Sequence, residues 1–282
     1  MKVKEIALLL TCHNRVQDTV RCLDCLYSCI LPEGASLEVF LVDDGSSDGT
    51  EDKIRLLFPF VNVIKGSGNL FWNRGMHLAW KTAIAKKQYN FYLWLNDDTF
   101  LFPNAIQVLI ESYNSCREES IVCGSTCSKL GNDITYGGFS KIGNMLLKPN
   151  GELQSCDFFN GNCVLIPNVV VKKIGILDNN FHHALGDMDY GRRAAKENIG
   201  LFISPLYVGT CEKHEDYPKW CSPKVPVSQR FKHLYKSSCD SNPLQLFIFE
   251  NRHHGFFMAA FHLFTINLRA LIPQIYNQRK KI

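Results

Sequence analysis

The strongest candidate for chemistry in this sequence is a pair of adjacent carboxylates, Asp97 and Asp98, directly after the apolar run Phe91–Leu95. Two adjacent carboxylates at the end of a strand repel each other unless a cation lies between or beside them. Mg²⁺ and Mn²⁺ prefer oxygen ligands and usually keep positions open for the phosphates of a substrate. The pair therefore predicts a divalent-metal site, with a structural turn as the alternative interpretation.

A second acidic pair, Asp43 and Asp44, follows the apolar run Val39–Val42 and opens a turn-rich stretch that continues to residue 50. Carboxylates after a strand can accept hydrogen bonds from a nucleotide base or from ribose hydroxyls. Here too a simple turn is the alternative. The first apolar run, Ile6–Leu10, is likewise followed by polar residues, at positions 11–14.

The elements that must position these clusters alternate between strand-like and helical patterns. Strands are predicted at 6–10, 39–42, 61–64 and 91–95, and helices at 16–30, 51–57, 74–87 and 103–113. Such alternation predicts an α/β fold whose mostly parallel central sheet is covered by helices on both faces. Ligands bind at the carboxyl ends of the strands in such sheets, so the three polar clusters are expected along one edge.

The pattern becomes less regular after about residue 120. Strands are predicted at 164–166 and 206–208, and helices at 169–174 and 187–197. The last of these helices begins with two acidic residues, Asp187 and Asp189. Acidic residues are favourable in the first turn of any helix, so an ordinary structural role is the alternative to a catalytic one.

Composition excludes several classes of protein. The 282 residues carry 31 Lys and Arg against 27 Asp and Glu, a net charge of +4, too small to indicate a nucleic-acid partner. Twelve cysteines in a chain of this length do not suggest a small disulfide framework, and many lie in apolar runs. The N-terminal apolar run is too short for a signal peptide. Reduced thiols and a cytoplasmic location are therefore expected.

Taken together, these residues resemble the family 2 glycosyltransferases, which have a GT-A fold. The residues at 11–14 resemble the family's opening loop, T-x-x-N, and V-D-D-G-S-S-D-G-T at 42–50 is close to its nucleotide-binding string. Asn96, Asp97 and Asp98 stand where the family places a D-x-D metal motif. Because the first position is Asn, the resemblance assigns the metal chiefly to Asp98, with Asp97 as support.

The resemblance continues to about residue 215. F-N-G-N-C-V-L-I-P at 159–167 resembles the glycine-bearing strand below the acceptor site. G-D-M-D-Y-G-R-R at 186–193 resembles the E-D-x-D-x-x-x-R motif, with Gly186 in place of the leading Glu, and it implies that Asp187 is the general base. The stretch 68–75, G-N-L-F-W-N-R-G, is similar to rhamnosyltransferase-like members.

The resemblance implies an inverting, divalent-metal-dependent glycosyltransferase using Mg²⁺ or Mn²⁺. A sugar would pass from a nucleotide-diphosphate donor, dTDP-rhamnose or a UDP-sugar, to a hydroxyl of a glycan or lipid-linked acceptor in bacterial surface-polysaccharide synthesis. A single base without a paired nucleophile implies direct displacement. Beside the base Asp187, the expected contacts are Thr11, Asn14, Asp43, Asp44, Asn73, Arg74 and Asp97 for the donor, Asp98 and His214 for the metal, and Gly161 and Asp189 for the acceptor.

Two other functions stay open at this point. A non-catalytic nucleotide-sugar-binding protein with a degenerate site fits Asn96 and Gly186, which depart from the family pattern. A nucleotidyltransferase is less favoured, because the loop at 11–14 has neither the glycines nor the Lys or Arg of a phosphate-binding loop.

The expected organisation is a GT-A catalytic domain at 1–215, with a donor half at 1–100 and an acceptor half at 101–215, and a helical extension at 216–282. Within the extension, an apolar helical face is formed by Phe257, Phe261, Phe264, Leu268 and Leu271, and basic residues follow at 279–281. The segment 256–272 is too short and too polar to span a membrane. We expect peripheral contact with the inner face of the cell membrane, with packing on the domain or in a homodimer as the alternative.

Overall fold

The computed structural model describes residues 4–116, 119–131, 133–213 and 218–274. In the first half of the chain the elements are β1 Lys4–Cys12, α1 Val16–Tyr27, β2 Ala35–Asp43, α2 Thr50–Leu57, β3 Asn62–Lys65, α3 Phe71–Lys86, β4 Phe91–Leu95, β5 Phe100–Leu101, α4 Ala105–Asn114, β6 Ser120–Cys127, β7 Ile134–Tyr136 and β8 Gly138–Ser140. The 3₁₀ helix η1 Ile142–Asn144 is followed by β9 Met145–Leu146, β10 Gln154–Ser155, β11 Phe158–Phe159, β12 Cys163–Pro167, α5 Asn168–Ile174, α6 Gly186–Lys196, β13 Gly200–Thr210, η2 Lys219–Cys221, α7 Val227–Leu234, α8 Pro243–His254 and α9 Phe256–Leu271.

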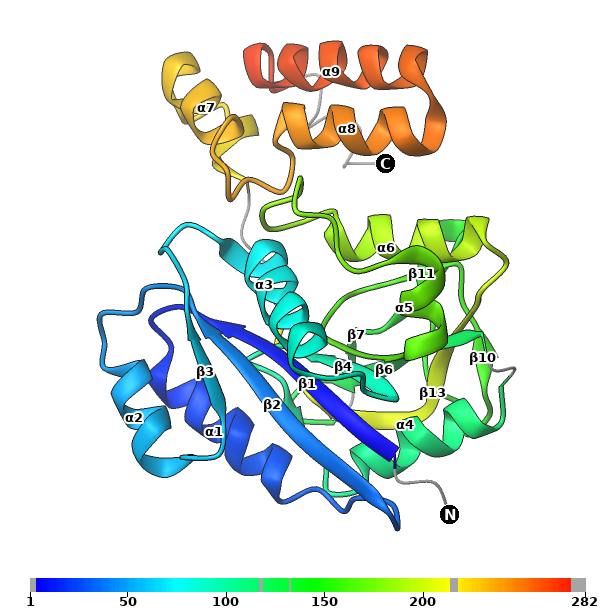
Figure 1. The fold of residues 1–282 in the computed structure, drawn as a ribbon. Helices are drawn as coiled ribbons and strands as arrows, with labels where there is room; N and C mark the ends of the chain where they lie inside the picture. The colour runs from blue at the N-terminus through cyan, green and yellow to red at the C-terminus, as the bar shows by residue number, and fades with distance from the viewer. Residues whose placement is uncertain (1–3, 117–118, 132, 214–217, 275–282) are drawn as a thin grey trace.

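A central sheet has the strand order β10-β13-β6-β12-β4-β1-β2-β3 (Figure 1). The four strands β3, β2, β1 and β4 are parallel, as the alternation of strands and helices predicts. β12 runs antiparallel to both β4 and β6, and β13 returns parallel to β6. The predicted mostly parallel sheet is therefore confirmed, and β12 is antiparallel because its chain reaches the sheet from the opposite end.

Helices cover both faces of this sheet because alternate residues of each buried strand point to opposite sides. In β1, for example, Leu8 packs into a core cluster with side chains of α1, α2 and α4, whereas its neighbour Leu9 packs into a second cluster with side chains of α3, α5 and α6. This arrangement leaves only the ends of the strands for polar groups, and the loops after β1, β2 and β4 meet at one edge.

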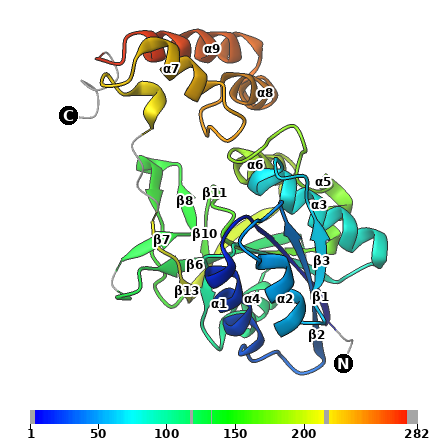
Figure 2. The same ribbon diagram turned by 90° about the vertical axis from the view of Figure 1, so that its left-hand side faces the viewer.

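The last part of the described chain forms a layer of helices, α7, α8 and α9, beyond the α6 end of the domain (Figures 1 and 2). A small cluster that includes Trp220, Leu234 and Ile266 joins η2, α7 and α9. Arg252 on α8 forms ion pairs with Asp178 and Asp189 of the domain. Among the described residues, no helix has the length and apolar character needed to cross a membrane.

Candidate active site

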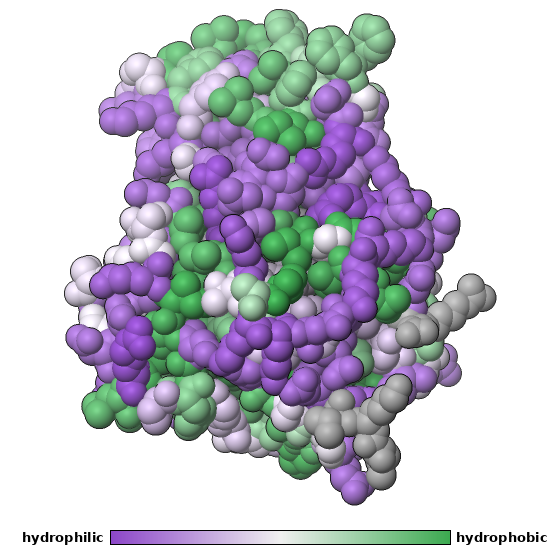
Figure 3. Space-filling model, viewed as in Figure 1, coloured by the Kyte–Doolittle hydropathy of each residue, from purple (hydrophilic) through white to green (hydrophobic). Residues whose placement is uncertain are grey.

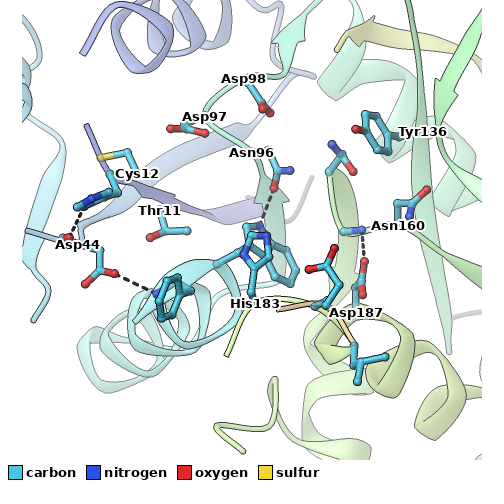
Figure 4. Close-up of a pocket in the computed structure, with 18 of the residues that line it drawn as sticks. Thr11, Cys12, Asp44, Asn96, Asp97, Asp98, Tyr136, Asn160, His183 and Asp187 are labelled. Atoms are coloured by element: carbon cyan, nitrogen blue, oxygen red, sulfur yellow. Dashed lines mark hydrogen bonds between the residues drawn. The ribbon is translucent and has the colours of Figure 1, made fainter. Parts of the chain in front are cut away.

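A pocket of about 750 Å³ opens at the edge where the loops after β1, β2 and β4 meet the start of α6 (Figure 4). Its lining combines residues from distant parts of the chain: Thr11, Cys12, His13, Arg15, Asp44, Phe71, Trp72, Asn96, Asp97, Asp98, Tyr136, Asn160, Gly161, Asn162, His183, Ala184, Leu185, Asp187, Met188 and Asp240. Figure 4 shows Asp97 and Asp98 along one side of the pocket and Asp187 along another. The structure thus gathers carboxylates from four separate segments around one pocket.

Arg15 lies between the two carboxylates that follow β4. Its Nη1 donates to Asp97 Oδ1 at 3.0 Å and to Asp98 Oδ2 at 2.8 Å. The other oxygen of Asp97, Oδ2, is buried and has no hydrogen-bond partner among the described residues. Burial raises the pKa of Asp97 to about 7, against the lowering effect of the Arg15 charge. The guanidinium group of Arg15 thus provides a positive charge beside this acidic pair.

These carboxylates also suit a divalent cation. Both offer hard oxygen atoms: Asp97 Oδ2 has no hydrogen-bond partner among the described residues, and Asp98 is partly exposed and lines the pocket. Among the described residues, no group of three or more His, Cys, Asp and Glu side chains is placed to hold a metal. Mg²⁺ and Mn²⁺ commonly take one or two carboxylates and complete their shell with water and substrate phosphates. His214, the second expected ligand, lies outside the described residues.

The Asp97 pKa leads to a prediction about stability. The unfolded carboxyl titrates near 3.9, so between pH 4 and 7 the folded protein holds a proton that the unfolded chain has lost, and stability must fall as pH rises. Relative to Asp97→Asn, the wild-type protein should lose roughly 2 to 3 kcal/mol of unfolding free energy between pH 5 and 8. Urea titrations of both proteins in a chelator measure this difference, and parallel pH profiles would contradict it.

Asn96 has a structural role in the wall of the pocket. Its Oδ1 accepts a hydrogen bond from Trp72 Nε1 at 2.7 Å. The Trp72 ring in turn packs so closely on Gly161 that a Cβ there would lie 2.5 Å from it. A side chain at position 96 therefore serves as an anchor for the indole, and the pocket wall at Gly161 depends on having no side chain.

The acidic pair after β2 organises the neighbouring loops. Asp44, which lines the pocket, accepts backbone hydrogen bonds from Gly68, Leu70 and Phe71 at 2.7 to 3.0 Å. Asp43 is buried and accepts from the Ser46 backbone N–H at 2.9 Å. Both carboxylates thus have a structural role, since they set the shape of the loop that leads into α3, and donor binding by them stays a prediction.

The two remaining donor candidates of the first loop also bind protein. Thr11 lines the pocket, and its Oγ1 donates to the Val42 carbonyl at 3.2 Å. Asn14 does not line the pocket; its Oδ1 accepts from the Ser47 backbone N–H at 2.7 Å and so ties the loop after β1 to the loop after β2. Asn14 shares a positive φ with Phe71 and Leu185, and such non-glycine backbone strain is concentrated at functional sites.

Asp187, the predicted base, lies in the first turn of α6 with its carboxylate on the pocket. Oδ2 accepts from the Gly161 backbone N–H at 2.9 Å, and Oδ1 accepts from the Met188 backbone N–H at 2.8 Å. Burial raises the pKa of Asp187 above its ordinary value, although these two hydrogen bonds act to lower it. Sequence alone could not show this burial. The carboxylate is held rigidly and is more basic than an exposed aspartate.

Asp189, expected at the acceptor, lies away from the pocket. Its carboxylate is fully buried and is paired with Arg193 at 2.8 Å, with Arg252 at 2.8 Å and with His253 at 2.9 Å. No part of this carboxylate is exposed to meet an acceptor, so the expectation is corrected. Asp189 instead joins α6 to α8.

Asn73 and Arg74 also do not line the pocket. Asn73 Nδ2 donates to the carbonyls of Asp178 and Phe181, both at 2.7 Å, and Arg74 Nε donates to the Asn179 carbonyl at 3.0 Å. Both side chains hold the start of α3 against the loop before α6. The Asn73 side chain is fully buried in these contacts, whereas the donor contact expected of the partly exposed Arg74 stays a prediction.

The side chain of Asn73 explains why Gly186 stands where the family pattern has Glu. A Cβ at Gly186 would lie 1.8 Å from Asn73 Oδ1, so neither Glu nor Ala fits without displacing a buried amide. We expect Gly186→Ala to lower the unfolding free energy by about 1 to 3 kcal/mol. Gly191→Ala, on the same helix, is the control, because its Cβ would meet Phe159 at an ordinary 3.4 Å. Equal melting temperatures for the two variants would contradict this assignment.

Several pocket residues were not identified from the sequence. Arg15 directly follows Asn14, but nothing in the sequence indicates that it reaches the carboxylates after β4. Tyr136 ends the short strand β7, and His183 and Asp240 lie in loops, so their placement at the pocket depends on tertiary structure. Asp240 belongs to the helical extension, which therefore contributes to the pocket.

The sequence is similar to known glycosyltransferases. Residues 8–175 match the model of glycosyl transferase family 2. Over 119 residues the chain is 27% identical to hyaluronan synthase of Streptococcus pyogenes, a match that covers 39% of this chain and only 27% of the synthase.

Solved structures share the fold at low sequence identity. The mannosyltransferase PcManGT from Pyrobaculum calidifontis, solved with GDP-Man and Mn²⁺, is 13% identical, with a TM-score of 0.58 over 99% of this chain and 76% of its own. S. aureus TarS 1-349 with UDP-GlcNAc is 14% identical, with a TM-score of 0.56 over 90% and 73%. GalNAc-T7, solved with UDP, GalNAc and Mn²⁺, is 15% identical, with a TM-score of 0.61 over 88% and 48%. The predicted GT-A fold is confirmed, and the chain belongs to glycosyl transferase family 2.

Proposed function

We propose that this protein transfers a sugar from a nucleoside-diphosphate donor to an acceptor hydroxyl, with inversion at the anomeric carbon. The observation that carries the proposal is the single pocket that joins the carboxylates of Asp97 and Asp98 to the carboxylate of Asp187. The first pair suits a cation and a diphosphate, and the third suits a hydroxyl proton. Membership of a family of glycosyl transferases supports the same reaction.

Different residues of the pocket have different roles in the proposed reaction. Asp98, supported by Asp97, would hold Mg²⁺ or Mn²⁺, and a cation bound there would offset the charge of the departing diphosphate. Arg15 keeps the two carboxylates together in its absence. Asp187 accepts the proton of the acceptor hydroxyl as its oxygen bonds to the anomeric carbon, while the bond from that carbon to the diphosphate breaks. In the proposed reaction no protein side chain forms a bond to the sugar. The acceptor oxygen therefore displaces the diphosphate directly, and the configuration inverts.

The donor is the part of the proposal that rests most on resemblance. We take dTDP-rhamnose as the first candidate, on the stretch at 68–75, and UDP-sugars as the second. The neighbouring structures were solved with GDP-Man, with UDP-GlcNAc and with UDP, so all belong in the screen. The acceptor proposed is a glycan or a lipid-linked sugar of a bacterial surface polysaccharide, reached from the cytoplasm.

The proposed organisation keeps a catalytic domain at 1–215 and a helical extension at 216–282. The family match at 8–175 lies inside the first of these. Asp240 nevertheless lines the pocket, so the extension completes the wall of the site that the domain begins.

A thermal-shift screen of nucleotide sugars, with and without Mn²⁺, tests the proposed function. A ligand that binds only the folded protein raises its apparent stability, by about 2.7 kcal/mol at a hundredfold excess over Kd. We expect a nucleoside-diphosphate sugar to raise the melting temperature more in Mn²⁺ than in chelator. If no nucleotide changes the melting temperature under either condition, the proposal is wrong. Binding without turnover for every acceptor tried would favour a non-catalytic sugar-nucleotide-binding protein.

A further inference from the structure

Helix α9 turns its largest apolar side chains away from the protein. Phe257 is 89% exposed, Phe264 is 65% exposed and Phe261 is 59% exposed, and Leu271 continues the same stripe at 50%. The side of α9 that packs inward carries Ala259, Ile266 and Ala270 instead. Figure 3 shows hydrophobic residues gathered over this end of the molecule, where Figure 1 places α9. We call the outward stripe of Phe257, Phe261, Phe264 and Leu271 the α9 face.

A contiguous aromatic surface of this kind marks an interaction site on a folded protein. In a helix on the surface of a water-soluble protein, the large apolar side chains are expected to face the core and polar side chains to face water. The reverse arrangement in α9 means that burial of the large side chains must come from a partner. The short polar interruptions, such as Thr265 and Asn267, fit a helix that lies along an interface rather than across one.

The charge of the chain indicates which partner this is. Residues 216–282 contain ten Lys and Arg against three Asp and Glu, whereas residues 1–215 contain 21 against 24. The extension therefore has a net charge of +7 and the catalytic domain a net charge of −3. An apolar face within a strongly basic segment is complementary to an anionic bilayer. A second copy of the extension would bring a charge of +7 against +7.

The extension is also fixed with respect to the pocket. Arg252 on α8 donates to Asp189 Oδ1 at 2.8 Å, and Asp189 is two residues from the predicted base on α6. The His182 backbone N–H donates to Gln245 Oε1 of α8 at 2.8 Å. Asp240 of the extension lines the pocket itself. A surface bound by α9 is thus held in a defined position relative to the site.

We propose that the α9 face binds an anionic lipid bilayer and so holds the pocket beside the membrane surface. Phe257, Phe261 and Phe264 enter the boundary between head groups and acyl chains, and the basic residues of the extension attract the anionic head groups. This binding requires no turnover, so a negative vesicle experiment would contradict membrane binding and leave the proposed transferase activity unaffected. Combined with that activity, it favours an acceptor that is attached to a lipid.

Flotation of the full-length protein with vesicles tests the proposal. The vesicles contain either phosphatidylcholine alone or phosphatidylcholine with about 30% phosphatidylglycerol, an amount at which a basic segment gains from the surface potential. We expect binding to the anionic vesicles, weakened at high salt because the charges are screened. Phe257→Ser/Phe264→Ser should weaken it at least about tenfold, since two exposed aromatic side chains no longer enter the bilayer.

The matched control is Leu56→Ser/Ile142→Ser, which removes two apolar side chains of similar exposure, 74% and 83%, from the catalytic domain. This variant should bind vesicles as the wild-type protein does, and both variants should keep the wild-type melting temperature. The proposal is overturned if the wild-type protein binds neither vesicle, or if the two double variants lose binding equally. A concentration-dependent dimer that Phe257→Ser/Phe264→Ser abolishes, without vesicle binding, would assign the α9 face to a second copy instead.

Discussion

Asp187→Asn is expected to lower the turnover number of sugar transfer by about 10²- to 10⁴-fold, the range that a general base contributes. The amide cannot accept a proton at neutral pH, whereas the native carboxylate is buried enough to have a raised pKa. The affinity for the donor should change little, because the residue acts on the acceptor. Release of nucleoside diphosphate at saturating donor measures the turnover number, and calorimetry measures donor affinity.

Asp189→Asn is the control for this prediction. It also replaces an acid in the first turn of α6, but Asp189 is buried among Arg193, Arg252 and His253 and does not line the pocket. We expect it to lower the melting temperature, because the guanidinium groups of Arg193 and Arg252 lose their counter-charge, and to keep a turnover number per folded molecule near the wild-type value. If Asp187→Asn retained wild-type turnover, or if both variants lost it equally without unfolding, Asp187 would not be the base.

Asp98→Asn should lower kcat/KM by about a hundredfold or more in Mn²⁺, because a neutral amide is a poor ligand for a hard cation that offsets the charge of a leaving diphosphate. Donor affinity in Mn²⁺ should fall with it. In a chelator the variant and the wild-type protein should bind the donor with the same affinity, since the metal-mediated contact is absent from both. Manganese-dependent affinity that persists in Asp98→Asn would contradict the assignment of the cation to Asp98.

The fold was predictable because its strands and helices are marked locally. The apolar run at 6–10 and the helical periodicity at 16–30 are seen in the structure as β1 and α1, and the same holds through α4. β6, a fully buried strand at the centre of the sheet, was not predicted, because S-I-V-C-G-S-T-C mixes small polar and apolar residues without either period. The direction of β12 depends on the path of the whole chain, which no local pattern contains.

The candidate site was predictable where residue type alone limits the chemistry. Adjacent carboxylates such as Asp97 and Asp98 suggest a cation wherever they lie, and the start of α6 suggested Asp187. Asn73 and Asp189 were expected at ligands because a sequence motif does not say which way a side chain points. Several of their partners, such as Arg252, come from segments more than 60 residues away. For the same reason Arg15 was not predicted at the site, although its side chain reaches Asp97 and Asp98.

The geometry of the pocket and the pKa of Asp187 together make a claim about stereochemistry, since direct displacement inverts the anomeric carbon. The most direct test is proton NMR of the first sugar product formed from a donor that the thermal-shift screen identifies, recorded before the product equilibrates. We predict an anomeric configuration opposite to that of the donor, with its rate of appearance lowered in Asp187→Asn. A product that retains the donor's configuration would contradict the account.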